Sequence, residues 1–557
     1  MQVRKGNFMT RGSRNLGVGQ TSVGARIEAQ LRQFGTDDRG TITVLCMIIF
    51  LGIIAICGFG VDLMMNEMKR AKLQHTLDRA VIAAADLEQE LDPAAVVADY
   101  FTKSGMGDAL ASTSVDQGLN YRTVHATASQ SNDTLFLGIL GIDQMTAPAA
   151  GEATEKMANV EISMVLDISG SMGSNNKIQN LRAAANDFVQ TVIQPVDAPS
   201  LTTVSMVPYN ATVNLGTTLA GYYTLSNEHN YSRCAIFPAS AFDTLGISRT
   251  QTLDRLSHFD LWSTDEAATE IAYPWCPSDD YGKIVVHSDD VTELQTNINA
   301  LGAGGNTAID LGMKWGMALL DPSARDLVDD MIVDGHITSR ASGRPTSYLD
   351  PDTLKIVVLM TDGANTTEYD LIPSRQSGLS EIFIDDRGDS DPSNDRFSAL
   401  IVDNADDAYD VYYWPRFETY YSSYKYRNGP DGGSAARRMT NEEVFARWGT
   451  RAFAYKFYQT PYNDGRVSYS TYYDAYYSYT GIVGPDAADA RLATICQAAR
   501  DAGVIVFAIG FEAPQRGLDA MQNCASSPSH YFDVQGIEIT DAFNAIAQTI
   551  TQLRLTQ

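Results

Sequence analysis

The sequence predicts an α/β fold: a doubly wound, mostly parallel sheet of Rossmann-like type that carries two large insertions. A single transmembrane helix and a small α+β stalk are expected before it. Three observations support this. The 22 residues between Arg39 and Asp62 carry no charge. From Val160 onward, apolar strands alternate with amphipathic helices, as in parallel sheets. Residues 209–290 and 364–485 are too long to be connecting loops.

The charge excludes nucleic acid as a partner. The 557 residues carry a formal net charge of −27, so no basic surplus is present to neutralise phosphates. Residues 1–40 contain seven Lys or Arg and three Asp or Glu, a net of +4, and the remainder therefore carries −31. This arm is polar and has no periodicity, and we expect it to be disordered.

The uncharged stretch is long enough to cross a membrane. As a helix it spans about 33 Å at about 1.5 Å per residue, against a hydrocarbon core of about 30 Å. A cleavable signal peptide is disfavoured because its apolar region is about 7–15 residues and no A-x-A-like site follows. The basic arm comes first, so the positive-inside rule puts it in the cytoplasm and the acidic bulk outside. We expect the helix of residues 41–91 to be a retained anchor; a buried core helix is the alternative.

Residues 92–157 are predicted to form the stalk. Pro93–Lys103 has a helical pattern, and Thr123–Ser129 and Thr134–Ile142 follow as alternating or apolar segments. The small residues of Ala147–Gly151 indicate a linker.

Residues 158–557 are predicted to form the main domain, with both insertions inside it. The expected strands are Glu161–Leu166, Thr202–Val207, Lys355–Thr361, Val504–Ile509 and His530–Val534. The expected helices are Lys177–Ile193, Val291–Leu301, Ala308–Leu320, Asp486–Ala502, Leu518–Asn523 and Asp541–Leu553.

Five oxygen-bearing side chains follow strand ends or precede helices in this domain. Asp167, Ser169 and Ser171 form a D-x-S-x-S motif after the first strand, Thr307 ends a Gly-rich loop, and Asp362 follows the strand Lys355–Thr361. Open α/β sheets bind ligands at the carboxyl ends of their strands, and hard oxygen ligands suit Mg²⁺, Mn²⁺ or Ca²⁺. The alternative for Asp167 alone is a helix-capping side chain.

The order D-x-S-x-S, Thr, T-D-G resembles the metal-ion-dependent adhesion site of von Willebrand factor A (VWA) domains. The resemblance implies a divalent cation, most readily Mg²⁺, bound directly by Ser169 and Ser171 and by Thr307 directly or through water. Asp167 and Asp362 would orient water and hydroxyls and supply negative charge. Most VWA domains are binding modules without catalysis, and a partner's acidic residue can take the remaining position on the ion.

The anchor region, roughly residues 35–90, resembles the N-terminal segment of TadG-type proteins of bacterial Flp/Tad pilus assembly. The resemblance rests on Gly40, Val61-Asp62, Leu73-Gln74 and Leu77-Asp78-Arg79-Ala80. Related minor pilins have a Glu shortly after a processing Gly, whereas this chain has Leu45 at the fifth position after Gly40 and so departs from the processing pattern. The resemblance implies a single-pass protein of the inner membrane whose external domain binds pilus-assembly components or pilins. The long helix could also pack against copies of itself.

The sequence leaves three alternative roles: an envelope adhesin or sensor unrelated to pili, a site that only scaffolds its loops, and a hydrolase. A hydrolase is disfavoured because Ser171 does not fit G-x-S-x-G and no His or Lys is placed as its base. We therefore expect a binding protein and no enzyme.

Cysteines and tyrosines complete the sequence evidence. Cys46 and Cys57 lie in the span, and the other four cysteines lie beyond it, where disulfides persist. Three pairings are possible, and we favour Cys234–Cys276 with Cys496–Cys524. Within the second insertion, the stretch from Tyr409 to Tyr479 holds 16 of the 27 tyrosines. They indicate either a partner-binding surface or mutual packing within the insert.

Overall fold

The computed structural model describes residues 41–556 apart from 87–88, 90, 118–120, 157, 196–197, 199 and 403–410. The chain divides into two compact units, one containing residues up to 116 with 122–154 and the other containing 117–121 with 155–557. The disordered arm predicted for residues 1–40 lies outside the described residues.

The first unit combines two helices with a three-stranded sheet. Helix α2 (Thr41–Ala85) is followed by α3 (Pro93–Lys103), and the sheet has the order β1 (Leu110–Gln117), β2 (Tyr121–Asp133), β3 (Gln144–Lys156). The second half of α2 forms a core with α3 through residues such as Leu73, Leu77 and Phe101. Its first half exposes apolar side chains, and α2 is long and apolar enough to cross a membrane.

One stalk prediction is wrong. Ala147–Gly151 is part of β3 and forms no linker. Its small residues have a packing reason, because a Cβ at Gly151 would lie 2.4 Å from the Leu77 side chain of α2. The apolar segment Thr134–Ile142 contains a short 3₁₀ helix, η3 (Leu137–Leu140), which ends at the left-handed Gly141 (φ 84°).

The second unit is built on a six-stranded sheet. Its order is β18 (Tyr531–Val534), β17 (Ile505–Phe511), β9 (Thr353–Thr361), β4 (Asn159–Asp167), β5 (Thr202–Tyr209), β8 (Val285–Ser288). The first five strands are parallel, and β8 pairs antiparallel with β5. The four-residue β8 lies within the stretch 209–290 that we predicted to be entirely insertion.

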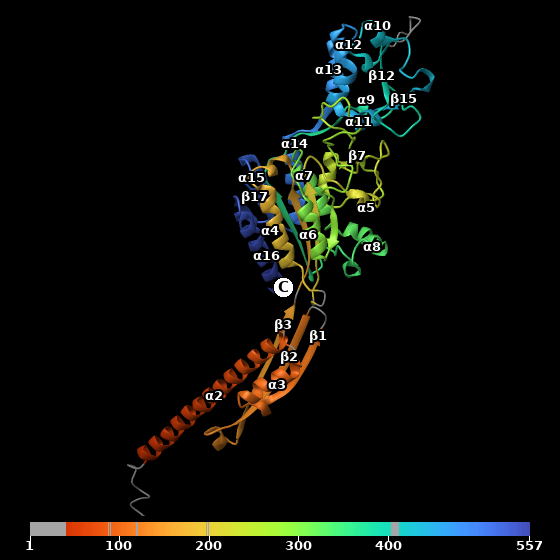
Figure 1. Ribbon diagram of the computed structural model, residues 1–557. Helices are drawn as coiled ribbons and strands as arrows, with labels where there is room; N and C mark the ends of the chain where they lie inside the picture. Colours follow the sequence, from red (N-terminus) through yellow and green to blue (C-terminus); the bar gives the residue numbers. More distant parts are fainter. Residues whose placement is uncertain are drawn as a thin grey trace, which may run out of the picture. The chain divides into compact units, whose positions relative to one another are not determined.

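Helices cover both faces of this sheet because alternate strand residues point to opposite sides. Ile162, Met164 and their counterparts pack against α4 (Lys177–Val192), α6 (Val291–Ala300) and α16 (Glu538–Thr556). Val165, Val207 and their counterparts pack against α7 (Ile309–Ala318), α8 (Arg325–Val333), α14 (Pro485–Asp501) and α15 (Gln515–Cys524). Helices α4 and α16 lie side by side (Figure 1).

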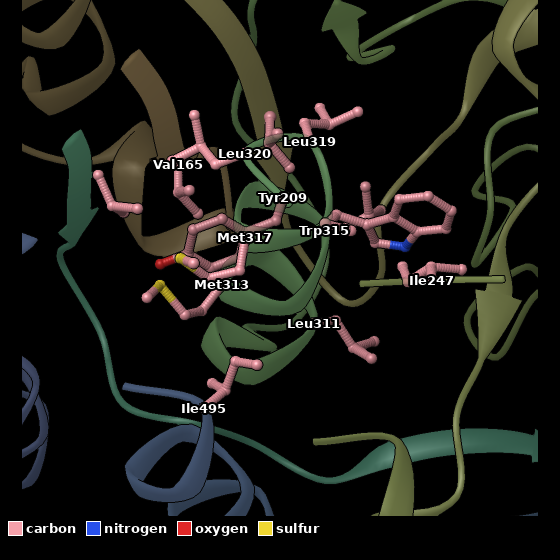
Figure 2. Close-up of a cluster of buried hydrophobic side chains, with 14 of the residues drawn as sticks. Val165, Tyr209, Ile247, Leu311, Met313, Trp315, Met317, Leu319, Leu320 and Ile495 are labelled. Carbon is pink, nitrogen blue, oxygen red and sulfur yellow. The ribbon is translucent and has the colours of Figure 1, made fainter. Parts of the chain in front are cut away.

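Helix α7 is buried along its whole length. Two glycines let it approach the sheet, because a Cβ at Gly312 would lie 2.6 Å from the Tyr209 ring and one at Gly316 would lie 2.5 Å from Val165. Its Trp315 points away from the strands, toward Ile247 of the first insertion (Figure 2). Helix α7 therefore joins the sheet to this insertion.

The first insertion has little regular structure: α5 (Gly216–Ala220), η5 (Ala239–Asp243), β6 (Ala235–Ile236) and β7 (Asp254–Arg255). Two of its cysteines form the disulfide Cys234–Cys276, and Cys496–Cys524 joins α14 to α15. Both favoured pairings are confirmed.

The second insertion has its own sheet, with the order β14 (Tyr426–Arg427), β13 (Val411–Tyr413), β12 (Arg396–Val402), β11 (Leu379–Asp385), β15 (Arg437–Thr440). Its helices include α9 (Pro373–Gln376), α10 (Ser422–Lys425), α11 (Asn441–Ala454), α12 (Thr460–Asn463) and α13 (Tyr469–Tyr476). Two antiparallel strands, β10 (Glu368–Leu371) and β16 (Tyr479–Val483), join it to the main sheet. Both insertions contribute to one apolar core.

We predict that Trp315→Ala lowers the free energy of unfolding by about 3–5 kcal/mol, because it leaves a large cavity. Trp315 is fully buried and its ring centroid lies 5.3 Å from that of Tyr223. Urea denaturation of the detergent-solubilised chain, followed by circular dichroism, measures the loss. Trp262→Ala is the matched control, because Trp262 is 52% exposed and its loss should be much smaller. Equal losses for the two variants would contradict this packing.

Candidate metal centre

Strand register brings the two predicted carboxylates to one edge of the sheet. Strand β4 ends at Asp167 and pairs in parallel with β9, whose last residue Thr361 precedes Asp362. The Thr361 hydroxyl donates to Asp167 Oδ2 at 2.7 Å, which links the two strand ends. Asp167 and Asp362 are therefore neighbours although 195 residues separate them in the chain.

Backbone hydrogen bonds tie the three loops together. Gly170 N donates to Gly305 O at 2.9 Å, and Gly304 N donates to Ile168 O at 2.9 Å, which joins the D-x-S-x-S loop to the Gly-rich loop. Thr366 N donates to Thr307 O at 2.9 Å and joins that loop to the segment after β9. A single rigid set of loops thus carries all five predicted residues.

The hydroxyls converge on Asp362. Ser171 Oγ donates to Asp362 Oδ1 at 2.6 Å, and Ser169 Oγ lies 3.1 Å from Ser171 Oγ. Thr307 belongs to the same cluster, because a Cβ built on Gly363 would lie 3.3 Å from Thr307 Oγ1 and 3.8 Å from Ser171 Oγ. The structure therefore brings together all five residues that the sequence predicted.

The cluster opens to solvent on one side. Asp167, Ser169, Thr307 and Asp362 are each at most 5% exposed, whereas Ser171 is exposed. A ligand can therefore reach the buried oxygens past Ser171 and its loop.

Burial makes negative charge at this edge unfavourable. It raises the pKa of Asp167 to about 6, and the charge of Asp362 adds to the shift, while hydrogen bonds from Ser169 and Thr361 oppose it. A positive charge beside the two carboxylates would relieve this cost.

The sequence analysis missed one such positive charge. Lys177 Nζ lies 3.1 Å from Asp362 Oδ2 and 3.8 Å from Glu512 Oε2, and the lysine is buried at the start of α4. Glu512 also accepts from Asn175 Nδ2 at 3.1 Å. Glu512 directly follows β17, so the strand-end rule that found Asp362 could have found it. No sequence signal gives the direction of the Lys177 side chain.

A second buried charge cluster includes Asp310, three residues after Thr307 in the chain. Arg491 Nη1 lies 3.8 Å from Asp310 Oδ2 and 3.7 Å from Glu368 Oε1. Two carboxyl groups thus share one guanidinium, and burial followed by the charge of Asp310 raises the pKa of Glu368 well above its usual range. Glu368 therefore keeps its proton at neutral pH.

We predict that this proton makes stability depend on pH. Because the folded pKa of Glu368 exceeds the unfolded value, its contribution is full below pH of about 4.5 and is lost as pH rises toward the folded pKa. Glu368→Gln imitates the protonated form and should flatten the fall in melting temperature between pH of about 4.5 and about 9. The exposed Glu228→Gln is the control. Identical pH profiles for wild type and Glu368→Gln would contradict the assignment.

The tyrosines of the second insertion pack together and are also exposed. Tyr462 of α12 stacks on Tyr472 of α13 with ring centroids 5.7 Å apart. The ring centroids of Tyr473 and of Tyr477, the residue after α13, lie 4.4 Å apart. Tyr469, Tyr473 and Tyr477 are nevertheless 41–58% exposed. Mutual packing and a partner-binding surface, the two interpretations of the tyrosine-rich segment, thus each have an observation in their favour.

These features define a class of protein: an open α/β domain that presents hydroxyls and carboxylates at the carboxyl edge of its parallel strands, joined to a unit with one long apolar helix. Residues 40–87 match the model of a family described as "Putative Flp pilus-assembly TadE/G-like". The resemblance expected for the anchor region is confirmed over these residues. No curated protein matches the chain.

Among solved structures, the chain is similar to the vWF domain of the type V pili tip protein Mfa5 from Porphyromonas gingivalis (16% identity, 72% of this chain and 97% of that chain, TM-score 0.30). It is also similar to the pilus adhesin RrgA from Streptococcus pneumoniae (12%, 79% and 49%, TM-score 0.29). A third is proximal thread matrix protein 1 from the mussel byssus with a zinc-occupied MIDAS motif (11%, 71% and 46%, TM-score 0.25). The chain thus spans about half of the last two. These TM-scores are low, and the likenesses carry no inference about function.

Proposed function

We propose that this chain is an envelope protein held in the bacterial inner membrane by α2, with its basic N-terminal arm in the cytoplasm. Its external VWA-type domain (residues 158–557, doubly wound and interrupted by the two insertions) binds protein partners through a divalent cation. It acts in Flp/Tad-type pilus assembly or anchoring. The observation that carries the proposal is the convergence of Asp167, Ser169, Ser171, Thr307 and Asp362 beside an exposed loop.

The donor set fits a hard divalent cation. It consists of hydroxyl and carboxylate oxygens, which Mg²⁺ prefers and Mn²⁺ and Ca²⁺ accept. The 3.1 Å between Ser169 Oγ and Ser171 Oγ is close to the separation of about 3 Å expected between adjacent oxygens that each lie about 2.1 Å from Mg²⁺. Two buried carboxylates, one of them with a raised pKa, supply the negative charge that a cation would neutralise.

Such an ion would supply an electrophilic point at the protein surface. Ser169, Ser171 and Thr307 would hold it, while Asp167 and Asp362 orient the hydroxyls and bound water. Because Ser171 is exposed, an Asp or Glu side chain of a partner can approach from that side. Lys177 contacts Asp362 and Glu512 rather than a serine hydroxyl, and the Ser171 hydroxyl donates to Asp362, which is itself one of the five residues that would serve the cation. The site therefore suits binding rather than nucleophilic catalysis.

The pilus context rests on the anchor. Residues 40–87 match the TadE/G-like family model, and α2 within them is apolar and exposed in its first half. Partners in that context are pilus-assembly components or pilins that present an acidic residue. The exposed tyrosines of α13 favour a second candidate, an envelope adhesin or sensor that uses the same metal site on an external ligand.

We predict that Lys177→Met tightens cation binding about tenfold, because it removes an ammonium group that a cation must oppose at Asp362. Ser171→Ala should weaken binding by a similar factor, because it deletes a ligand oxygen. Isothermal titration of the chelator-treated chain with Mn²⁺ measures both. Ser174→Ala is the control, since this exposed serine lies outside the five residues. Weaker binding by Lys177→Met would mean that the lysine orients Asp362 instead of competing with the ion.

The functional test is capture of purified pilus-assembly components by the full-length chain in detergent, with Mg²⁺ or with chelator. We expect binding only with Mg²⁺, and we expect Asp167→Ala to abolish it while Ser174→Ala does not. Binding that is equal under chelation would contradict the metal-dependent role and leave the tyrosine-rich insertion as the leading interface.

A further inference from the structure

The loop between β2 and β3 is unusually apolar for a surface loop. Residues 134–142 (TLFLGILGI) contain no charge, and six of the nine are Leu, Ile or Phe. Leu135, Ile139 and Leu140 are 65%, 83% and 69% exposed. Loops in water expose polar side chains, and a contiguous exposed apolar patch marks an interaction site.

Asp62 of α2 holds this loop against the helix. Asp62 Oδ1 accepts from Leu135 N at 2.9 Å, and Oδ2 accepts from Phe136 N and Leu137 N, each at 2.8 Å. The carboxylate is 5% exposed, so these three backbone donors replace its contact with water.

Two further contacts hold the loop at the same position along α2. Phe136 packs on Gly58, where an added Cβ would lie 2.4 Å from the ring. Asn132 Nδ2 donates to Asn66 Oδ1 at 3.2 Å, and both asparagines are buried. The apolar loop therefore lies against α2 between Gly58 and Asn66.

This contact extends the apolar surface of α2 beyond the uncharged stretch of the sequence. With Asp62 covered, the next charged side chain is Glu67, and Leu63 and Met64 continue the exposed apolar surface. Residues 41–66 then span about 39 Å as a helix, which exceeds the hydrocarbon thickness of about 30 Å. The middle part of α2, which contacts the loop, would therefore lie at the edge of the hydrocarbon layer.

We propose that the β2–β3 loop inserts its apolar tip into the outer interface of the bilayer that α2 spans, directly beside α2. The inference rests on the proposed anchoring by α2. Lipid is the occupant that the observations favour, because the tip is continuous with the membrane-facing surface of the helix. Asp133 and Asp143 bracket the tip at its base and remain in water or among headgroups. Two attachments, helix and loop, would hold the three-stranded sheet at a fixed orientation to the membrane.

Nitroxide quenching of single labels tests this in the full-length chain, reconstituted in nanodiscs of phosphatidylethanolamine and phosphatidylglycerol. An environment-sensitive fluorophore is attached at Ile139→Cys in a background with Cys46→Ser and Cys57→Ser. The label on native Cys46, with Cys57→Ser, reports the anchor. A label at Lys103→Cys, on the exposed end of α3, is the aqueous control. The quencher is a lipid whose nitroxide lies near the top of the acyl chain.

We expect the label at position 139 to show blue-shifted emission and to be quenched, whereas the label at position 103 shows neither change. If position 139 behaves like position 103 while Cys46 lies in lipid, the inference fails and the anchor stands. If Cys46 is also in water, the anchoring fails with it. A blue shift at position 139 without lipid quenching would mean that protein covers the tip, which also overturns the proposal.

A second variant tests the contact made by Asp62. Asp62→Ala removes the acceptor of the three backbone bonds, so we expect quenching at position 139 to fall while the label on Cys46 is unaffected. Unchanged quenching at position 139 would show that Asp62 does not hold the tip in place.

Discussion

The site depends on one electrostatic constraint: two carboxylates, Asp167 and Asp362, lie buried side by side at the ends of adjacent parallel strands. Burial and their mutual repulsion raise the pKa of Asp167, so this edge of the sheet needs donors or positive charge. The surrounding loops supply serine and threonine hydroxyls and the Lys177 ammonium group. A divalent cation would meet the same need.

Asp62 of α2 is another buried carboxylate that needs hydrogen-bond donors. A carboxylate within an apolar helix surface is costly unless its oxygens are hydrogen-bonded. Here three backbone N–H groups of the β2–β3 loop supply the bonds, and the loop brings its own apolar side chains with it. In both places a buried carboxylate accepts hydrogen bonds from a loop that is distant in the sequence.

Much of this could be predicted from the sequence because it depends on local pattern. The apolar runs that became β4 and β9, with the D-x-S-x-S and T-D-G residues at their ends, place four of the five residues by the strand-end rule, and Thr307 comes from the Gly-rich loop before α7. Lys177 could not be predicted, since the direction of its side chain depends on how α4 packs. The small residues of Ala147–Gly151 indicated a linker, whereas they are small because α2 packs on β3. Thr134–Ile142 has strand-like composition, but its backbone donors bond to Asp62 across the unit.

The most direct test is a crystal structure of the domain grown with Mn²⁺, with anomalous scattering recorded for the metal. We expect one anomalous peak within bonding distance of Ser169 Oγ, Ser171 Oγ and the Thr307 side chain or its water, with Lys177 Nζ moved away from Asp362. Absence of a peak at this edge, with Lys177 still paired to Asp362 at saturating Mn²⁺, would contradict it.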